Sequence, residues 1–276
     1  YFDRITRPEQ ILSSLPQALQ VMLDPADCGP ATISLSQDVQ GEAFDYPEIF
    51  FEEKIHIIRR IHPDPRQLNE AAEKLKLSKQ PIIIAGGGIL YSEAEKELSD
   101  FAKKHNIPVT PTVMGIGCMT KDDPYYIGAI GCLGEGSSNS LSKDTDLALA
   151  IGTKLGDFTT GSWSNFQNED FKLVSINTAR FDVTKHLATP VISDAKIGLL
   201  ELSKALGDWR APNNWYERSI DERKKWDSYV EKQSGPTNQE LPSYAHAVGA
   251  VYRNADPSDI VVTAAGGLVG EVVQIW

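Results

Sequence analysis

The sequence predicts an α/β protein built around a three-layer parallel sheet, and three observations support this prediction. Short apolar runs, such as residues 81–85 and 147–151, alternate with stretches whose apolar residues recur at helical spacing. Runs that are apolar without interruption are typical of strands buried on both faces, between two layers of helices. These two runs are also followed directly by Gly86 and Gly152, as expected at sharp turns that leave a strand.

The expected central sheet lies between residues 66 and 206, where predicted strands and helices alternate. Ser92, with Glu95 three residues later, predicts a capping box at the start of one helix. Five or six strands would be a normal number for one such sheet. The strands are expected at 81–85, 109–112, 147–151, 172–176 and 190–192. Helices are expected at 68–77, 92–105 and 195–206, and residues 138–143 are expected to be the end of another helix.

The regions on either side of this sheet predict parts of other domains. A helix at 8–23 and a strand at 31–35 cannot bury their own apolar faces, so we expect them to belong to a larger domain. A polar, tryptophan-bearing stretch predicts an exposed helix at 215–230. A helix at 244–253 and a strand at 259–263 then predict the start of a further α/β domain.

These changes predict five segments. They are the end of a first domain at 1–46, a proline-bearing linker at 47–65, the central domain at 66–206, a second linker at 207–242, and the start of a last domain at 243–276. No methionine precedes Tyr1, and we therefore expect an internal fragment of a longer protein.

Composition bounds the function. The chain has 276 residues, 41% hydrophobic and 24% charged, which is typical of a globular protein with a packed core. A net charge of -11 repels phosphate backbones and argues against nucleic-acid binding. No apolar run approaches the roughly 20 residues that span a bilayer, so no membrane association is expected. Cys28, Cys118 and Cys132 predict free thiols in a reducing compartment, the cytoplasm.

The first candidate for ligand binding is Gly86-Gly87-Gly88, between a predicted strand and a predicted helix. Glycines there let a backbone approach a phosphate, and a helix N-terminus favours negative charge. The dinucleotide pattern G-x-G-x-x-G is only half met, because Tyr91 stands at the third glycine position. The strand at 109–112 also ends without an acidic residue that would bind a ribose. A tight turn is therefore the preferred interpretation.

Two further loops are candidates for a polar ligand. Residues 134–139 could offer backbone N–H groups to an anion, or the nearby glycines could serve chain crossings with positive φ, and we weigh these equally. Residues 152–161 bring Lys154, Asp157 and two threonines together, and a loop in which Asp157 accepts from backbone donors is slightly favoured over a phosphate site. Residues 134–139 end a longer glycine-dense run made of Gly115, Gly117, Gly128, Gly131, Gly134 and Gly136.

The histidines fit no nucleophile and base arrangement, so we interpret each as a surface or helix-end residue and assign no catalytic residue. They are His56, His62, His105, His186 and His246.

The order of these parts resembles the thiamine-diphosphate enzymes related to acetolactate synthase. On this resemblance, residues 29–39 look like the end of the family's pyrimidine-binding domain and residues 259–267 like the start of its diphosphate-binding domain. The likeness covers nearly the whole chain. The stretches that look like the Rossmann-like central domain are 81–88, 106–112, 114–117, 128–131 and 146–154.

Three stretches, residues 1–10, 38–47 and 157–162, look more like family members that hydrolyse a cyclic diketone in myo-inositol catabolism. The resemblance implies that the parent enzyme cleaves a carbon–carbon bond of the diketone. Thiamine diphosphate then acts as electron sink, with Mg²⁺ as its metal. The family builds its active sites between subunits, so the resemblance also implies a homodimer or a tetramer.

Several functional parts of the family have no counterpart here. The activating glutamate lies in a region that this sequence lacks, and Gly156-Asp157-Phe158 and Gly207-Asp208-Trp209 do not match the metal-binding Gly-Asp-Gly motif. We therefore expect no catalytic or metal-binding residue in this chain, and an inactive fragment if it is isolated.

Only Gly266, Gly267 and Leu268 match positions that approach the cofactor's diphosphate. In flavin-containing relatives a central-domain arginine contacts the flavin, and Lys154 at that position weighs against FAD.

Two alternatives to the diketone hydrolase stay open. One is an acetolactate synthase-like carboligase or decarboxylase. The other is a non-catalytic domain, either binding a nucleotide or serving as an architectural spacer at residues 66–206.

Overall fold

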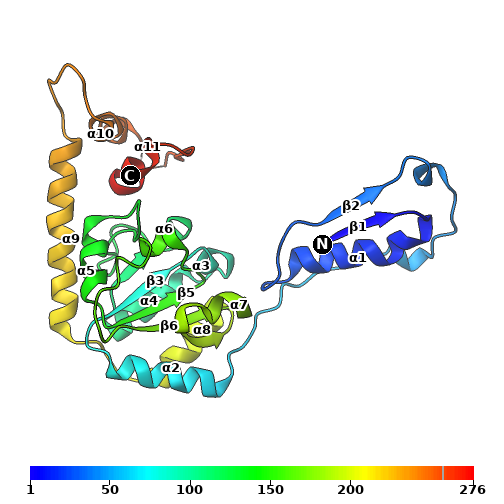
Figure 1. Cartoon of the computed structure of the whole chain (residues 1–276), viewed down its shortest axis with the longest axis horizontal. Helices are drawn as coiled ribbons and strands as arrows, with labels where there is room; N and C mark the ends of the chain where they lie inside the picture. Colours follow the sequence, from blue (N-terminus) through cyan, green and yellow to red (C-terminus); the bar gives the residue numbers. More distant parts are fainter. Residues whose placement is uncertain (257) are drawn as a thin grey trace. The chain divides into compact units, whose positions relative to one another are not determined.

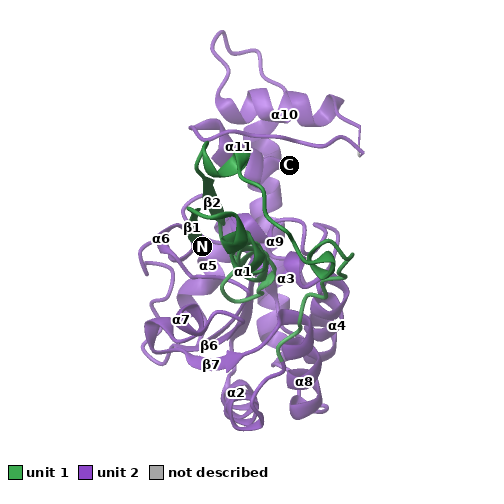
Figure 2. Cartoon of the chain, turned by 90° about the vertical axis from the view of Figure 1, so that its right-hand side faces the viewer, with its two compact units in different colours: residues 1–61 green, residues 62–276 purple. Residues whose placement is uncertain are grey.

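The computed structural model describes residues 1–256 and 258–276 and divides the chain into two compact units, residues 1–61 and 62–276 (Figure 2). Each unit is described by itself below.

The smaller unit pairs two short parallel strands beside a helix. Strand β1 (Phe2–Ile5) runs in register with β2 (Thr32–Leu35), from Phe2↔Thr32 to Ile5↔Leu35. Helix α1 (Ile11–Leu23) follows the 3-10 turn η1 (Pro8–Gln10), and two more 3-10 turns, η2 (Val39–Gly41) and η3 (Glu48–Phe50), lie after β2. The sequence did not predict β1, because four residues give too little periodicity.

The larger unit contains the predicted parallel sheet, and this prediction is confirmed. Its strands are β3 (Pro81–Ala85), β4 (Val109–Pro111), β5 (Leu147–Ile151), β6 (Lys172–Asn177) and β7 (Thr189–Ile192). All pairs are parallel, and the order across the sheet is β4-β3-β5-β6-β7. Strands β3, β5 and β6 are labelled in Figure 1.

Separate apolar cores cover the two faces of the sheet, which makes three layers. Ile83 and Leu149 face one core, which also holds side chains of α2, α4 and α8. Ile82 and Ala148 face the other, with Leu141 of α5. Successive side chains of a strand point to opposite faces, so both faces of β3 and β5 must be apolar. This is why these strands appear in the sequence as unbroken apolar runs.

The helices that cover the sheet follow the strands in alternation. They are α2 (Pro65–Leu77), α3 (Gly88–Tyr91), α4 (Glu95–His105), α5 (Gly136–Asp144), α6 (Asp157–Thr160), α7 (Arg180–Val183) and α8 (Ala195–Leu206), with the 3-10 turns η4 (Val113–Gly115) and η5 (Lys185–Leu187).

The predicted capping box at Ser92 is wrong. Helix α4 begins at Glu95, and its N-cap is Ala94, which makes no side-chain cap hydrogen bond. The Ser92 hydroxyl instead donates to Asp194 Oδ2 at 2.8 Å, across 102 residues of sequence. Asp194 is itself the N-cap of α8. A tertiary hydrogen bond therefore takes the place of the expected local one.

The described residues of the C-terminal part of this unit form the helices α9 (Asn213–Ser234), α10 (Tyr244–Asn254) and α11 (Leu268–Ile275). Helix α9 is not simply exposed, because Trp215 is buried and its indole N–H donates to the Pro81 carbonyl at 2.8 Å. The strand predicted at 259–263 is not formed. Within the described part of the chain no strand lies beside it, so its backbone has no ladder to join.

Candidate functional site

Ligands of open parallel sheets usually bind where the strand order reverses, at the carboxyl ends of the strands. Here the neighbours β3 and β5 occupy that point. Gly86 N–H donates to the Ile151 carbonyl at 2.8 Å, and Gly88 N–H donates to the Gly152 carbonyl at 3.0 Å. The turns that follow the two strands therefore contact each other directly.

This contact explains why glycines stand at these positions. A Cβ on Gly86 would lie 2.2 Å from the Gly152 oxygen, and a Cβ on Gly88 would lie 2.5 Å from the Gly152 Cα. Gly152 itself has φ +60. Space too small for a methyl group cannot admit a phosphate between the two turns. The interpretation of Gly86-Gly87-Gly88 as a tight structural turn is therefore the better one.

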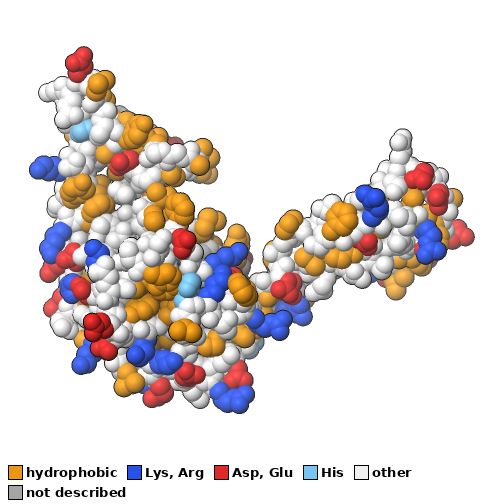
Figure 3. Space-filling view, viewed as in Figure 1, with side chains coloured by type: hydrophobic (Ala, Val, Ile, Leu, Met, Phe, Trp, Pro, Cys, Tyr) orange, Lys and Arg blue, Asp and Glu red, His pale blue; other side chains and the backbone are white. Residues whose placement is uncertain are grey.

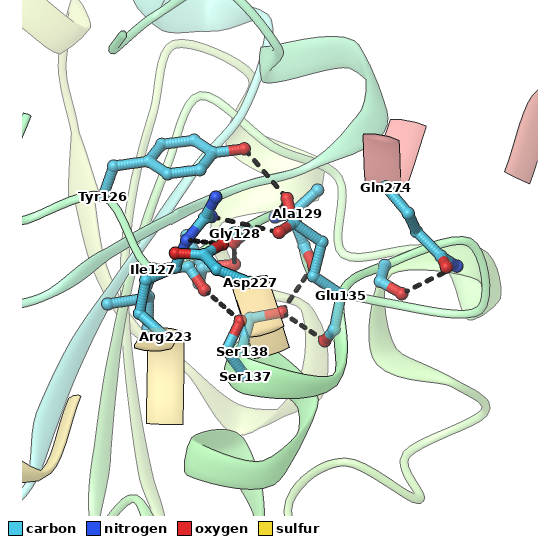
Figure 4. A network of polar contacts seen from close by, with 12 residues as sticks. Tyr126, Ile127, Gly128, Ala129, Glu135, Ser137, Ser138, Arg223, Asp227 and Gln274 are labelled. Atoms are coloured by element: carbon cyan, nitrogen blue, oxygen red, sulfur yellow. Dashed lines mark hydrogen bonds and ion pairs between the residues drawn. The ribbon is translucent and has the colours of Figure 1, made fainter. Parts of the chain in front are cut away.

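The glycine-rich loop at residues 128–136 closes around an acid of its own. The Glu135 carboxylate is completely buried, and its Oε1 accepts from Tyr126 Oη and from Ala129 N–H, both at 3.1 Å (Figure 4). Gly128 has φ +97, and a Cβ there would lie 2.7 Å from Glu135 Cδ. The Glu135 carboxylate thus occupies the position inside this loop that the sequence offered as a possible binding site for an external anion.

Arg223 of α9 supplies the countercharge. Its Nη1 lies 3.0 Å from Glu135 Oε2 and its Nε lies 2.7 Å from Asp227 Oδ1. Burial alone would lower the pKa of Arg223, but the two carboxylates more than offset this, and the pKa is raised. Burial, reinforced by Glu135, also raises the pKa of Tyr126. The tyrosine is therefore a neutral hydrogen-bond donor and the arginine a fixed cation.

The loop at residues 152–161 contains two charged residues that were considered as ligand-binding candidates, and both are exposed. Lys154 and Asp157 are exposed, and among the described residues neither side chain forms an ion pair or hydrogen bond. The hydrogen bonds are backbone ones, such as Ser162 N–H to the Asp157 carbonyl at 3.1 Å. The prediction that the Asp157 carboxylate satisfies backbone donors is wrong, because the short helix α6 begins at this residue and turns its side chain outward.

His105 is a helix-end residue, which is one of the two alternatives that the sequence predicted, but it does not lie at the surface. It ends α4 but is fully buried, with Nδ1 2.7 Å from the Trp209 carbonyl and Nε2 3.0 Å from Ser203 Oγ. Burial lowers the pKa of His105. A neutral ring donates from Nδ1 and accepts at Nε2, so both contacts are satisfied. This makes His105 a core residue and not a proton-transfer group.

The three cysteines are free: Cys28 and Cys132 are exposed, and Cys118 is buried. Burial raises the pKa of the Cys118 thiol to about 12, so it is inert as a nucleophile.

Gly266, Gly267 and Leu268 lie together at the start of α11, and all three are exposed. Gly266 has φ +146, a conformation that L side chains rarely adopt, and a Cβ at this position would meet no atom within 4 Å. The first N–H groups of a helix have no partner inside the helix and carry positive partial charge. The geometry is therefore open to an anionic ligand.

A hollow adjoins this turn, and a second hollow lies on residues 259–261, before the turn. One, of about 250 Å³, lies between α10, residues 261–263 and α11, and Leu268 and Val272 help to line it. A larger one, of about 740 Å³, lies between α10 and residues 259–261. Their linings are mainly apolar, and Val251, Ile260 and Val262 among the lining residues are exposed. Hydrophobic side chains are visible at the C-terminal end of the larger unit in Figure 3.

Among the described residues, no group of three or more His, Cys, Asp or Glu side chains is arranged to hold a metal ion. None of the described helices is both long enough and apolar enough to cross a membrane.

A comparison with known protein families also identifies a match over the residues of the sheet. Residues 68–202 match the family model described as thiamine pyrophosphate enzyme, central domain. Residues 68–202, which include all five strands of the sheet, are therefore similar to the central domain of thiamine pyrophosphate enzymes.

Two curated relatives of the chain have the same name. The chain is 36% identical over 300 aligned residues to 3D-(3,5/4)-trihydroxycyclohexane-1,2-dione hydrolase of Bacillus anthracis, an alignment that covers 100% of the chain and 47% of the relative. It is 34% identical to the protein of the same name from Clostridium perfringens, again over 100% of the chain and 47% of the relative. The chain thus spans about half the length of these curated relatives.

The sequence reasoning missed the Glu135–Arg223 pair. The two residues are 88 positions apart, and no spacing rule connects a loop acid with an arginine on a distant helix. The only local signal was an acid placed between Gly134 and Gly136 in an otherwise uncharged loop.

Proposed function

We propose that the intact protein is a thiamine-diphosphate-dependent hydrolase that cleaves a carbon–carbon bond of 3D-(3,5/4)-trihydroxycyclohexane-1,2-dione in myo-inositol catabolism. The observation that supports this most is the identity of 34–36% to hydrolases of that name over the whole chain. The match of residues 68–202 to the central domain of thiamine pyrophosphate enzymes supports the cofactor. We propose Mg²⁺ as its metal, a homodimer or tetramer as its assembly, and the cytoplasm as its location.

The role proposed for this chain in cofactor binding is limited to Gly266, Gly267 and Leu268. When bound, thiamine diphosphate supplies a thiazolium ring that stabilises a carbanion. The exposed N–H groups at the start of α11 fit one end of a diphosphate, because they combine unpaired donors with the positive end of the helix dipole. The residues described here offer no acidic cluster for the metal, so its ligands are not assigned to this chain.

The central domain is proposed as a scaffold. The turns that follow β3 and β5 pack on each other, and the glycine-rich loop at residues 128–136 encloses Glu135. Lys154 is exposed at the position where flavin-containing relatives have an arginine, which gives FAD less support than thiamine diphosphate.

The proposal is tested by assaying the intact protein with the cyclic diketone and with pyruvate, each with thiamine diphosphate and Mg²⁺. Ring opening of the diketone is expected. Turnover of pyruvate alone would identify a carboligase or decarboxylase instead. A thermal-shift screen with FAD, NAD and ADP addresses the non-catalytic alternative, because a ligand that binds only the folded state raises its melting temperature.

The cofactor residues are tested by calorimetry with Gly266→Ala and its control Gly41→Ala. An alanine at Gly266 must adopt φ +146 or distort the turn, whereas Gly41 has free space around it and no positive φ. We expect weaker thiamine diphosphate binding only for Gly266→Ala. Equal affinity of both variants and the wild type would remove Gly266 from the site. The 276-residue chain alone is expected to bind weakly, and micromolar affinity would contradict this.

A further inference from the structure

We propose that the Glu135–Arg223 ion pair is a positioning device that fixes α9 on the central sheet and thereby sets the place of the Gly266–Leu268 turn. The proposed function enters only in the last step, where that turn binds thiamine diphosphate. The preceding steps concern contacts within the larger unit alone.

The pair holds α9 in one register. Glu135 takes hydrogen bonds from Tyr126 and Ala129 as well as the ion pair with Arg223, so its carboxylate cannot move without breaking several contacts. Arg223 is held at both ends of its guanidinium, by Glu135 and by Asp227 one turn further along α9. The guanidinium also lies over the Tyr126 ring, 5.1 Å from its centroid. Sliding or rotating α9 would leave a buried carboxylate without its cation, which costs far more than losing an exposed pair.

The far end of α9 then holds α10. Arg253 Nη1 donates to the Ser234 carbonyl at 2.5 Å. Gly249 lets the two helices approach closely, since a Cβ there would lie 2.2 Å from the Ser234 oxygen. The position of α10 therefore follows that of α9.

Helix α11 completes the circuit back to the same loop. Tyr252 of α10 and Trp276 pack edge to face with centroids 5.5 Å apart. Gln274 Nε2 of α11 donates to the Gly134 carbonyl at 3.4 Å, next to Glu135 (Figure 4). The loop at residues 128–136 thus contacts α11 directly. It also determines the position of α11 indirectly, through its contact with α9 and the contacts of α9 with α10. Any ligand at the start of α11 is placed by this circuit.

The test compares Glu135→Gln with Asp144→Asn in the intact protein. Asp144 pairs with Arg218 of the same helix α9, but this pair is roughly half exposed. Hydrogen exchange is measured for residues 213–234 and 268–275. We expect faster exchange in both segments for Glu135→Gln and no change in 268–275 for Asp144→Asn. An unchanged 268–275 segment in Glu135→Gln would overturn the proposal.

Cofactor affinity gives the second measurement. Apparent Kd rises in inverse proportion to the fraction of competent molecules, so a turn that is correctly placed about one tenth of the time binds about tenfold more weakly. Leu75→Ala, on the other face of the sheet, controls for lost stability alone and is expected to bind as the wild type does. Equal affinities of Glu135→Gln and Leu75→Ala would contradict a positioning role.

Two further variants keep the test decisive if Glu135→Gln fails to fold. Arg223→Lys keeps the charge but not the fork that reaches both carboxylates, and an intermediate exchange rate in 268–275 is expected. Gln274→Ala removes the direct contact of α11 and is expected to speed exchange only there. Wild-type rates in both variants would overturn the proposal. If the wild type itself does not bind thiamine diphosphate, the proposed function fails, while the exchange data still decide the positioning role.

Discussion

Strand β3 and residues 259–263 have the same kind of sequence but different structures. Both are short runs rich in β-branched apolar residues, Pro-Ile-Ile-Ile-Ala and Asp-Ile-Val-Val-Thr. Three glycines follow the first run directly, and two glycines follow the second after two alanines. Strand β3 has neighbours on both sides, and Ile82, Ile83 and Ile84 are fully buried. In the other run Ile260 is 90% exposed and Val262 89% exposed, and no strand forms.

The difference shows that an apolar run can form a strand only when the fold supplies a neighbouring strand. A strand needs a neighbour for its N–H and C=O groups and a layer on each apolar face. Strand β3 finds β4 and β5 in the described chain, together with cores on both sides. In the described part of the chain, residues 259–263 pair with no strand, and they line two hollows together with residues of α10 and Trp276.

The largest expected effect on stability tests this comparison directly, by replacing one isoleucine in each run with alanine. Ile83→Ala leaves a cavity in the buried core and is expected to lower the free energy of unfolding by about 2–5 kcal/mol. Ile260→Ala removes a side chain that is already in solvent and should change it by less than about 0.5 kcal/mol. Urea denaturation measures both. Similar losses would mean that residues 259–263 are packed in solution.

A second, smaller effect concerns the glycines that follow the strands. Gly86→Ala places a methyl group 2.2 Å from the Gly152 oxygen, and forcing the turns apart is expected to cost about 1–3 kcal/mol. Gly156→Ala is the matched control, because a Cβ there meets no atom within 4 Å. Thermal unfolding of both variants sharpens the comparison. If Gly86→Ala melted at the wild-type temperature, the close packing of the turns would be disproved.

The smallest effect is a pH dependence from His105, buried beside the same sheet. Burial lowers its folded-state pKa below the ordinary value of 6.5, so the unfolded chain binds the proton first as the pH falls. The stability contribution is complete above pH 6.5 and is lost as the pH falls through the folded-state pKa. His105→Gln should flatten this decline. His56→Gln, an exposed linker residue, should leave it as in the wild type. A slope unaffected by His105→Gln would refute the assignment.

Much of the central sheet could be predicted because its signals are local. Strands β3 and β5 and helix α8 have the predicted bounds, since an unbroken apolar run or a helical period ends within a residue of a glycine or a capping acid. The turn role of Gly86-Gly87-Gly88 could also be predicted from the incomplete dinucleotide pattern. The assignment of Gly266, Gly267 and Leu268 to the cofactor and the division into five segments stay predictions.

The errors share a physical cause. Ser92 has the local signature of a cap, but a stronger partner, Asp194, is brought to it by the fold. Asp157 was assigned by the usual behaviour of its residue type, whereas the exposure of its side chain depends on packing. His105 ends a helix as predicted, but its burial also depends on packing. None of these outcomes leaves a trace at short sequence range.

By itself the sequence determined the α/β class, the alternation of strands and helices, and the family whose central domain residues 68–202 resemble. These follow from periodicity, turn residues and the order of motifs, all of which act over a few residues at a time. Only the tertiary structure decided which buried acid meets which cation, which glycines separate two backbones, and which apolar run is paired. Each of those depends on groups that are far apart in the chain and meet only when the larger unit has folded.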